Sequence, residues 1–342
     1  MKKWILRIAK PLFGLSLLAL VAYQLDVDEL RGLLTRDDPL RLLLSFCSFF
    51  AALCVFQAWR LHVLVRKYTG SARASLKLFF IGAFFNNLLP SNVGGDAVRL
   101  LYLRNLAAGQ WAGPLSMLML HRVSGLLMIL AMFCLYALLS PRRLLTAMAS
   151  GQLQWAMPNA LPPLLWPALL LAGVSGLWLL LKTRIGRRLV ERGRAGLRAF
   201  WLSLFELPRR VHGSLFVLTV LFHATRMLGF HWAVGAFGET LPLWDLVPVL
   251  TFTAAMALLP VTVGGLGVVE GSVTVGLGMF GISPSVAVAA ALLHRFALVF
   301  VALLGGLVYA LDRDRRTLRP PASEQGTAAG GPGQLSTRER IG

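Results

Sequence analysis

Several apolar runs in this chain have the length that spans a lipid bilayer. Residues 164–181 form one such run, and residues 285–311 form another. A hydrocarbon core about 30 Å thick is matched by a helix of about 20 apolar residues. Because 56% of the 342 residues are hydrophobic and only 14% are charged, the composition argues against a soluble fold. We predict an all-α, multi-pass membrane protein.

The net charge of +19 does not indicate nucleic-acid binding in this setting. The basic residues cluster just outside the apolar runs, where positive charge sets membrane topology and meets anionic lipid. The three cysteines, Cys47, Cys54 and Cys134, lie inside apolar segments and lack metal-ligand spacing. We therefore expect membrane lipids as partners, with no nucleic acid, no metal and no cofactor.

Six segments are apolar enough to be full transmembrane helices. They are residues 11–25, 40–65, 114–139, 162–182, 211–236 and 284–311. Two further apolar regions, 75–98 and 244–280, contain proline and glycine in their middle. Proline removes a backbone donor and breaks a helix, so we expect each of these two regions to be interrupted.

The two interrupted regions carry one motif twice. The chain reads LLPSNVGG from residue 88 and LLPVTVGG from residue 258. Proline and paired glycines leave backbone groups unpaired, which lipid cannot satisfy but a polar ligand or an enclosed water can. The predicted breaks are Pro90, Gly94, Gly95, Pro260, Gly264, Gly265, Gly267 and Gly271. The alternative is that the glycines only permit tight packing, because Gly267 and Gly271 have GxxxG spacing.

Positive charge predicts how the chain threads the membrane. The basic N-terminus and the basic segment 182–198 both belong in the cytoplasm. Counting spans between these points requires region 75–98 to cross an even number of times. The same count holds for region 244–280, which enters from the opposite face. We therefore predict two oppositely oriented re-entrant hairpins of broken helices in an inverted-repeat architecture.

Three parts follow from this count. Residues 1–311 form a polytopic transmembrane domain of two halves, about 11–139 and 162–311, and its first helix is an uncleaved span. Residues 182–210 form a basic, amphipathic cytoplasmic loop. Residues 312–342 are rich in Pro, Gly and small polar residues and are expected to be a disordered cytoplasmic tail.

Ionisable residues occur at membrane depth, where each charge costs on the order of 2.5–3.5 kcal/mol on insertion scales. They are Asp96, Arg99, Arg122, Arg226, Glu270 and Arg295. If the two acids each neutralise one arginine, positive charge remains, and the planar guanidinium fork suits a phosphate. We expect the four arginines to bind a lipid headgroup and the acids to position them. The alternative is that Asp96–Arg122 and Glu270–Arg295 are neutralised pairs that only hold the hairpins against the spans.

Polar side chains accompany these charges. Asn86, Asn87 and Asn92 give the first hairpin amide groups for a headgroup. Histidines precede or flank the arginines, namely His121, His223, His231 and His294. We interpret them as hydrogen-bonded packing residues rather than proton carriers.

Three long stretches resemble one known family. FFNNLLPSNVGGDAVRLLYL, MLHRVSGLL and LLPVTVGGLGVVEGSVTVGLGMFGISP are similar to the hallmarks of a bacterial, flippase-like membrane family related to the transmembrane domain of lysylphosphatidylglycerol synthases. The resemblance covers about residues 10–311. It implies that Gly95, Asp96, Arg99, Pro260, Gly265, Gly267, Glu270 and Gly271 carry the family's motifs. The chain departs from the family where His121 and Val269 stand, since an acid and an arginine are common there.

The resemblance implies movement of a modified phospholipid between leaflets, and no counterpart of the soluble synthase domain is present in the sequence. We expect translocation of an anionic or polyprenyl-type lipid across the bacterial inner membrane, with both termini in the cytoplasm. P-loop, GxSxG and HExxH motifs are absent, so an enzyme is not expected. The alternatives are a membrane subunit that scaffolds a lipid-modifying enzyme or glycosyltransferase and, more weakly, an intramembrane lipid transferase.

Overall fold

The computed structural model describes residues 38–88, 94–149, 207–257 and 265–312, and every regular element in these ranges is helical. Four of the described helices are long and apolar enough to cross a membrane. They are Pro39–Thr69, α7 (Ala112–Leu139), α12 (Arg209–Ala236) and α15 (Pro284–Leu311). They confirm the predicted all-α membrane fold and match four of the six predicted spans.

Other predicted segments lie outside the described residues. They are the spans 11–25 and 162–182, most of the loop 182–210, the tail beyond residue 312, and the positions Pro90, Asn92, Pro260 and Gly264.

The helix Pro39–Thr69 has three consecutive parts with local causes. α3 (Pro39–Ala51) starts where Asp38 Oδ1 accepts the N–H groups of Leu40 at 3.0 Å and Arg41 at 3.3 Å, with Pro39 in the first turn. A π-helical segment, η1 (Ala52–Gln57), separates it from α4 (Ala58–Thr69). α4 ends at Gly70, which adopts a left-handed conformation with φ of 68°.

Each of the two interrupted regions holds a pair of shorter helices, as predicted. The first pair, called here the first hairpin, is α5 (Ala72–Leu88) and α6 (Gly94–Leu106). The second pair, the second hairpin, is α13 (Leu246–Ala257) and α14 (Val268–Gly278), preceded by a 3₁₀ turn, η2 (Leu243–Asp245). The helices within each hairpin pack against each other.

Each hairpin begins and ends at the same end of the bundle. Tyr68, before the first hairpin, lies so close to Gly113, after it, that a Cβ on Gly113 would be 2.3 Å from the Tyr68 hydroxyl. At the second hairpin, the Ser283 N–H donates to the Glu239 carboxylate at 3.1 Å. The chain therefore leaves each hairpin next to the point where it entered.

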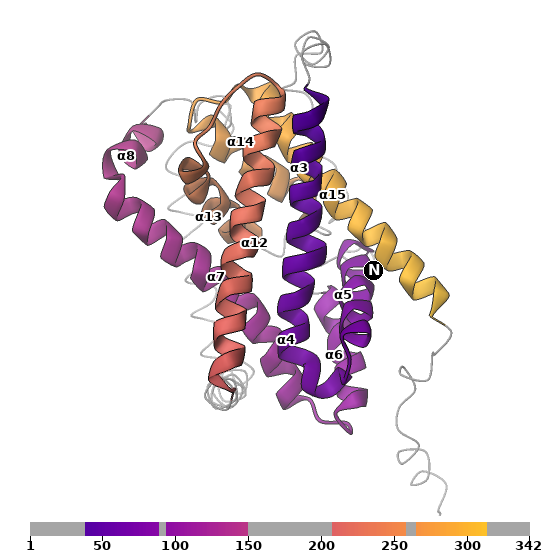
Figure 1. Cartoon of the computed structure of the whole chain (residues 1–342). Helices are drawn as coiled ribbons and strands as arrows, with labels where there is room; N and C mark the ends of the chain where they lie inside the picture. Colours follow the sequence, from indigo (N-terminus) through magenta and orange to yellow (C-terminus); the bar gives the residue numbers. More distant parts are fainter. Residues whose placement is uncertain (1–37, 89–93, 150–206, 258–264, 313–342) are drawn as a thin grey trace, which may run out of the picture.

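The two hairpins open at opposite ends (Figure 1). The Asp38 N–H donates to the Ala236 carbonyl at 3.1 Å, so the start of α3 lies beside the end of α12, where the second hairpin begins. The first hairpin begins after Thr69, at the other end of a 31-residue helix. A helix of that length spans about 46 Å. This opposed arrangement agrees with the predicted inverted repeat.

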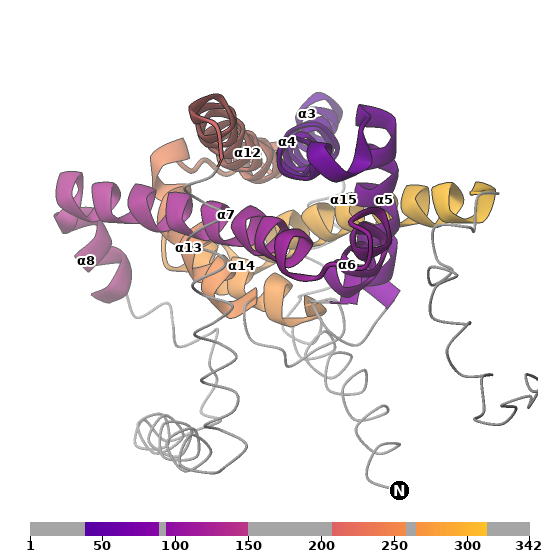
Figure 2. The same cartoon turned by 90° about the horizontal axis from the view of Figure 1, so that it is seen from below.

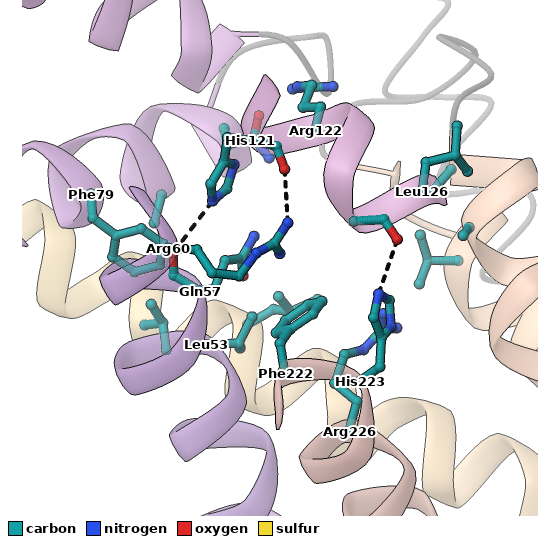
Figure 3. Close-up of a pocket in the computed structure, with 18 of the residues that line it drawn as sticks. Leu53, Gln57, Arg60, Phe79, His121, Arg122, Leu126, Phe222, His223 and Arg226 are labelled. Atoms are coloured by element: carbon teal, nitrogen blue, oxygen red, sulfur yellow. Dashed lines mark hydrogen bonds between the residues drawn. The ribbon is translucent and has the colours of Figure 1, made fainter. Parts of the chain in front are cut away.

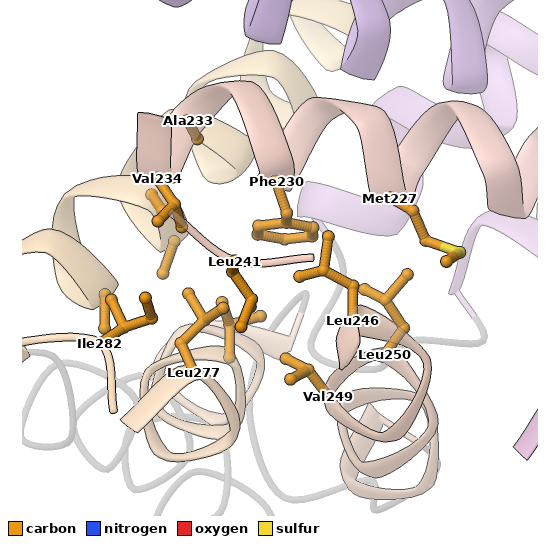
Figure 4. Close-up of a cluster of buried hydrophobic side chains, with 14 of the residues drawn as sticks. Met227, Phe230, Ala233, Val234, Leu241, Leu246, Val249, Leu250, Leu277 and Ile282 are labelled. Atoms are coloured by element: carbon orange, nitrogen blue, oxygen red, sulfur yellow. The ribbon is translucent and has the colours of Figure 1, made fainter. Parts of the chain in front are cut away.

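The two halves pack against each other through equivalent elements. α3 lies alongside α12, and Figure 2 shows this pair along one side of the bundle, with α7 and α15 beneath it. Each hairpin also packs on the last span of the other half, α5 on α15 and α13 on α7. Figure 4 shows one core where α12 meets α13 and α14, with Phe230, Leu250 and Leu277 fully buried. Because each hairpin packs against the other half, residues from both halves meet at the centre of the bundle.

Candidate functional site

A cavity of about 380 Å³ lies where the helices of the two halves meet (Figure 3). The broken ends of both hairpins reach it. Asn86 and Asn87 line it from the end of α5, and Asp96 from the first turn of α6. Ala257, the last residue of α13, and Val269, near the start of α14, line it from the other hairpin. The two interruptions that the sequence predicts therefore converge on one space.

Charge in this cavity is predominantly positive. Among the described residues that line it, four are arginines and one is a carboxylate: Arg60, Arg99, Arg122, Arg226 and Asp96. Much of the remaining wall is apolar, including Leu53, Leu126, Ile129, Leu298 and Val301. Charges act over longer distances in such surroundings than in water. The cavity thus suits a ligand with an anionic group and an apolar part.

Asp96 forms ion pairs with two of the four cavity arginines and offsets one of their positive charges. Its Oδ1 accepts from Arg99 Nη1 at 2.8 Å, and its Oδ2 accepts from Arg122 Nε. Arg99 Nη2 also donates to the Phe79 carbonyl at 2.9 Å. The Asp96 side chain is 11% exposed, whereas the Arg122 side chain is 36% exposed.

Glu270 and Arg295 form the matching pair in the second half. Glu270 Oε1 accepts from Arg295 Nε, and Oε2 accepts the Gly267 N–H at 2.7 Å. Asp96 and Glu270 are both the third residue of their helices, where a carboxylate is favoured by the helix dipole. The structure thus contains both ion pairs that the sequence suggested, at equivalent positions. Glu270 and Arg295 are not among the residues that line the cavity.

Close approach explains the glycine at the start of α6. A Cβ on Gly95 would lie 2.1 Å from the Gly82 carbonyl oxygen, so α5 and α6 could not meet there with a larger residue. Gly94, which is also buried, opens α6. Gly82 in turn leaves the space that Arg99 fills, because its Cβ would lie 2.1 Å from Arg99 Nε. The glycines of the first hairpin therefore place Arg99 and Asp96.

Backbone conformation explains the glycines before α14. Gly265 has φ of 71° and Gly267 has φ of 81°, values that strain other residues. Gly271 would have nothing within 4 Å of an added Cβ. The tight-packing alternative required a close neighbour at Gly271, and the described residues provide none.

Arg60 is a cavity residue that the sequence analysis missed. It is 2% exposed, and its Nη2 donates to the His121 carbonyl at 2.9 Å and to Ser124 Oγ at 3.0 Å. Its guanidinium carbon lies 5.4 Å from the centre of the Phe222 ring. The guanidinium carbon of Arg226 lies 5.6 Å from the same ring centre. Phe222 therefore contacts one arginine from each half.

A sequence signal for Arg60 exists. Residues 56–60 read FQAWR and residues 222–226 read FHATR, the same Phe-x-Ala-x-Arg in the second predicted span of each half. LHR also occurs twice, at residues 120–122 and 293–295. Together with LLPxxVGG and LHR, Phe-x-Ala-x-Arg is thus a third pattern repeated in the same order. Arg60 and Arg226 are therefore equivalent positions of the repeat.

The histidines contact backbone and rings, as packing residues do. His121 Nε2 donates to the Gln57 carbonyl at 3.3 Å, and His223 Nε2 donates to the Gly125 carbonyl at 3.0 Å. His231 Nδ1 donates to the Leu241 carbonyl at 2.8 Å. His294 packs edge-on against Phe49, with ring centres 4.9 Å apart.

These features define a multi-pass α-helical membrane protein with two opposed hairpins around an arginine-lined cavity. The chain belongs to the family described as the lysylphosphatidylglycerol synthase TM region, whose sequence model matches residues 7–306. This confirms the resemblance found in the motifs and associates the protein with lipid handling. Comparison with curated proteins and with solved structures gave no match.

Proposed function

We propose that the protein translocates a lipid with an anionic headgroup between the two leaflets of the bacterial inner membrane. The observation that carries the proposal is the central cavity, which is lined by four arginines, one carboxylate and residues beside the helix break of each hairpin. The membership in a family related to lipid handling supports it. The cargo is an anionic phospholipid or a polyprenyl-type lipid phosphate.

A phosphate headgroup fits the chemistry of this cavity. Arginine keeps its charge in apolar surroundings and binds phosphate through two parallel N–H donors. The first turns of α6 and α14 contribute to the cavity wall, and the positive end of a helix dipole favours an anion. Asn86 and Asn87 add amide groups for the rest of the headgroup. Asp96 holds Arg99 and Arg122 in place and lowers the net charge.

The opposed hairpins supply a route for exchange. Many transporters place substrate between inverted repeats that rock against each other, so that the site opens to one side and then the other. Here one hairpin opens at each end of the bundle, and both reach the same cavity. In our proposal the cytoplasmic face is the end that carries Tyr68 and Gly113, and both termini are cytoplasmic.

Leaflet exchange of fluorescent phosphatidylglycerol in proteoliposomes tests this function. Exchange faster than in protein-free liposomes is expected for the wild type. Arg122→Gln should slow exchange at least about tenfold. The substitution removes a positive charge from the cavity wall and with it one ionic hydrogen bond to the headgroup. Arg142→Gln, an exposed arginine outside the cavity, removes the same charge and should leave exchange unchanged.

Other outcomes would reject the proposal. Folded wild-type protein that exchanges neither phosphatidylglycerol nor a polyprenyl phosphate would favour the scaffold role, which depends on the basic residues 182–198. A new lipid species formed from an added donor would favour an intramembrane transferase.

A further inference from the structure

We propose that Arg60 and Arg226 together form the phosphate-binding subsite of the cavity, with one arginine supplied by each half of the repeat. The proposal rests on the function proposed above, but it assigns the ligand's charge to two particular residues. It separates them from the arginines that form ion pairs with Asp96 and Glu270.

The cavity arginines divide into two classes by their partners. Arg99 and Arg122 both contact Asp96. Arg60 and Arg226 have no carboxylate contact in the part of the chain that the structure describes. None of the described residues accepts a hydrogen bond from the Arg226 side chain either. Its described contact is with the Phe222 ring. Among the cavity arginines, the two that lie against the Phe222 ring are thus the ones without a described carboxylate partner.

Arg60 is more than nine-tenths buried and is only partly satisfied. Its Nη2 is bonded to the His121 carbonyl and to Ser124, yet its buried Nε has no hydrogen-bond partner. A guanidinium has five N–H donors, and a buried charge without a counterion is costly. If Arg60 served packing alone, an apolar side chain of similar volume would cost less. An anion in the cavity would accept from the donors that remain.

The surroundings leave both guanidinium groups available to a phosphate ligand, because no described carboxylate of the protein binds them. Phe222 contacts both guanidinium groups, and stacking on a ring leaves the N–H edges of an arginine available for a ligand. Leu53, Leu126 and Leu298 form nearby wall that suits an apolar chain. The shared chemistry is a phosphate monoester, diester or diphosphate, from a lipid headgroup or from a soluble compound.

A phosphate held in this way would connect the two halves of the protein. Arg60 belongs to α4 and already contacts α7 through the His121 carbonyl, while Arg226 belongs to α12. The ligand would therefore bind to two spans directly and would be connected to α7 through Arg60. Loss of either arginine would weaken binding without removing an ion pair.

Binding to the purified full-length protein in a neutral detergent tests the subsite. The probes are short-chain phosphatidylglycerol, short-chain phosphatidylcholine, glycerol 3-phosphate and inorganic phosphate. The variants are Arg226→Gln, Arg60→Lys, and Arg210→Gln as a control that removes an exposed charge from the same helix as Arg226. Arg226→Gln is the decisive variant, because Arg226 has no described hydrogen bond to lose.

We expect phosphatidylglycerol to bind the wild type and the Arg210→Gln control equally. Arg226→Gln should bind it roughly 10- to 100-fold more weakly, as expected for loss of one ionic hydrogen bond. Arg60→Lys should weaken it by a similar factor, since lysine keeps the charge but not the fork. Competition by glycerol 3-phosphate would identify a soluble phosphate as a ligand, and its absence would identify a lipid.

Unchanged affinity in folded Arg226→Gln would overturn the subsite. If the wild type still exchanged lipid, the proposed function would stand, and the lipid phosphate would bind to residues other than Arg226. If the wild type bound phosphatidylglycerol through Arg226 but exchanged no lipid, the subsite would stand and transport would fall.

Discussion

Glu270 accepts a hydrogen bond from Arg295 where both side chains are withdrawn, with 2% of Glu270 and 12% of Arg295 exposed. The equivalent Arg122 in the first half is 36% exposed and lines the cavity. Each half thus has an ion pair that holds a hairpin against a span, but only the pair of the first half lines the cavity. We infer that the second pair serves stability and the first also serves the ligand.

Glu270→Gln should therefore destabilise the protein strongly. Removing one partner of a buried ion pair leaves an uncompensated charge and costs about 3–5 kcal/mol. The midpoint of heat denaturation in detergent should fall. Asp38→Asn is the matched control, because the Asp38–Arg41 pair is more than 40% exposed and asparagine also caps helices. Equal, small shifts in the two variants would contradict the structural role of Glu270.

Gly267 and Gly271 separate backbone conformation from packing. Gly267→Ala should cost about 1–2 kcal/mol, because φ of 81° is unfavourable for a residue with a Cβ. Gly271→Ala should be neutral or should stabilise α14 by up to about 1 kcal/mol, since the added methyl meets none of the described residues. Thermal denaturation of the two variants measures the difference. A larger loss at Gly271 would restore the GxxxG interpretation.

Gly95→Ala should disrupt the first hairpin. The new methyl would lie 2.1 Å from the Gly82 carbonyl oxygen, so the α5 and α6 backbones must separate. We expect a loss of at least about 1–3 kcal/mol and weaker lipid exchange, since Arg99 and Asp96 move with α6. Gly213→Ala in α12, which has nothing within 4 Å of the added methyl, is the control and should not lower stability. A tolerated Gly95→Ala would show that the contact between α5 and α6 is dispensable.

Cysteine labelling tests the opposed hairpins. In a background without the three native cysteines, Ser71→Cys and Gln110→Cys flank the first hairpin, and Thr240→Cys precedes the second. All three positions are exposed. A membrane-impermeant thiol reagent should reach the first two from the cytoplasmic side and Thr240→Cys only from the other side. Labelling of Ser71→Cys and Gln110→Cys from different sides would refute the inverted repeat.

The four described spans and the two interrupted regions were predictable because both depend on local properties of the chain. Apolar length predicts a span, and a proline with paired glycines predicts a break wherever the segment lies in the fold. The two ion pairs could be anticipated from the duplicated motifs. Whether a pair lines the cavity could not be anticipated, because that depends on how α14 packs on α15, and Arg295 is not among the described residues that line it.

Arg60 was not predicted for a related reason. It stands a few residues before Arg66 and Lys67, so in the sequence it resembles part of an interfacial basic segment. Its burial arises from contacts with α7, far away in the sequence. In the sequence alone, only the repeated Phe-x-Ala-x-Arg pattern relates Arg60 to Arg226.

The π-helical segment η1 determines which way Arg60 points. Each residue of a regular helix turns the chain by about 100°, and a wider π turn changes the phase of everything after it. If residues 52–57 were regular α-helix, α4 would be rotated about its axis relative to α3, and Arg60 would point in another direction. A single deletion in this segment would therefore alter the cavity's charge without touching any residue that carries it.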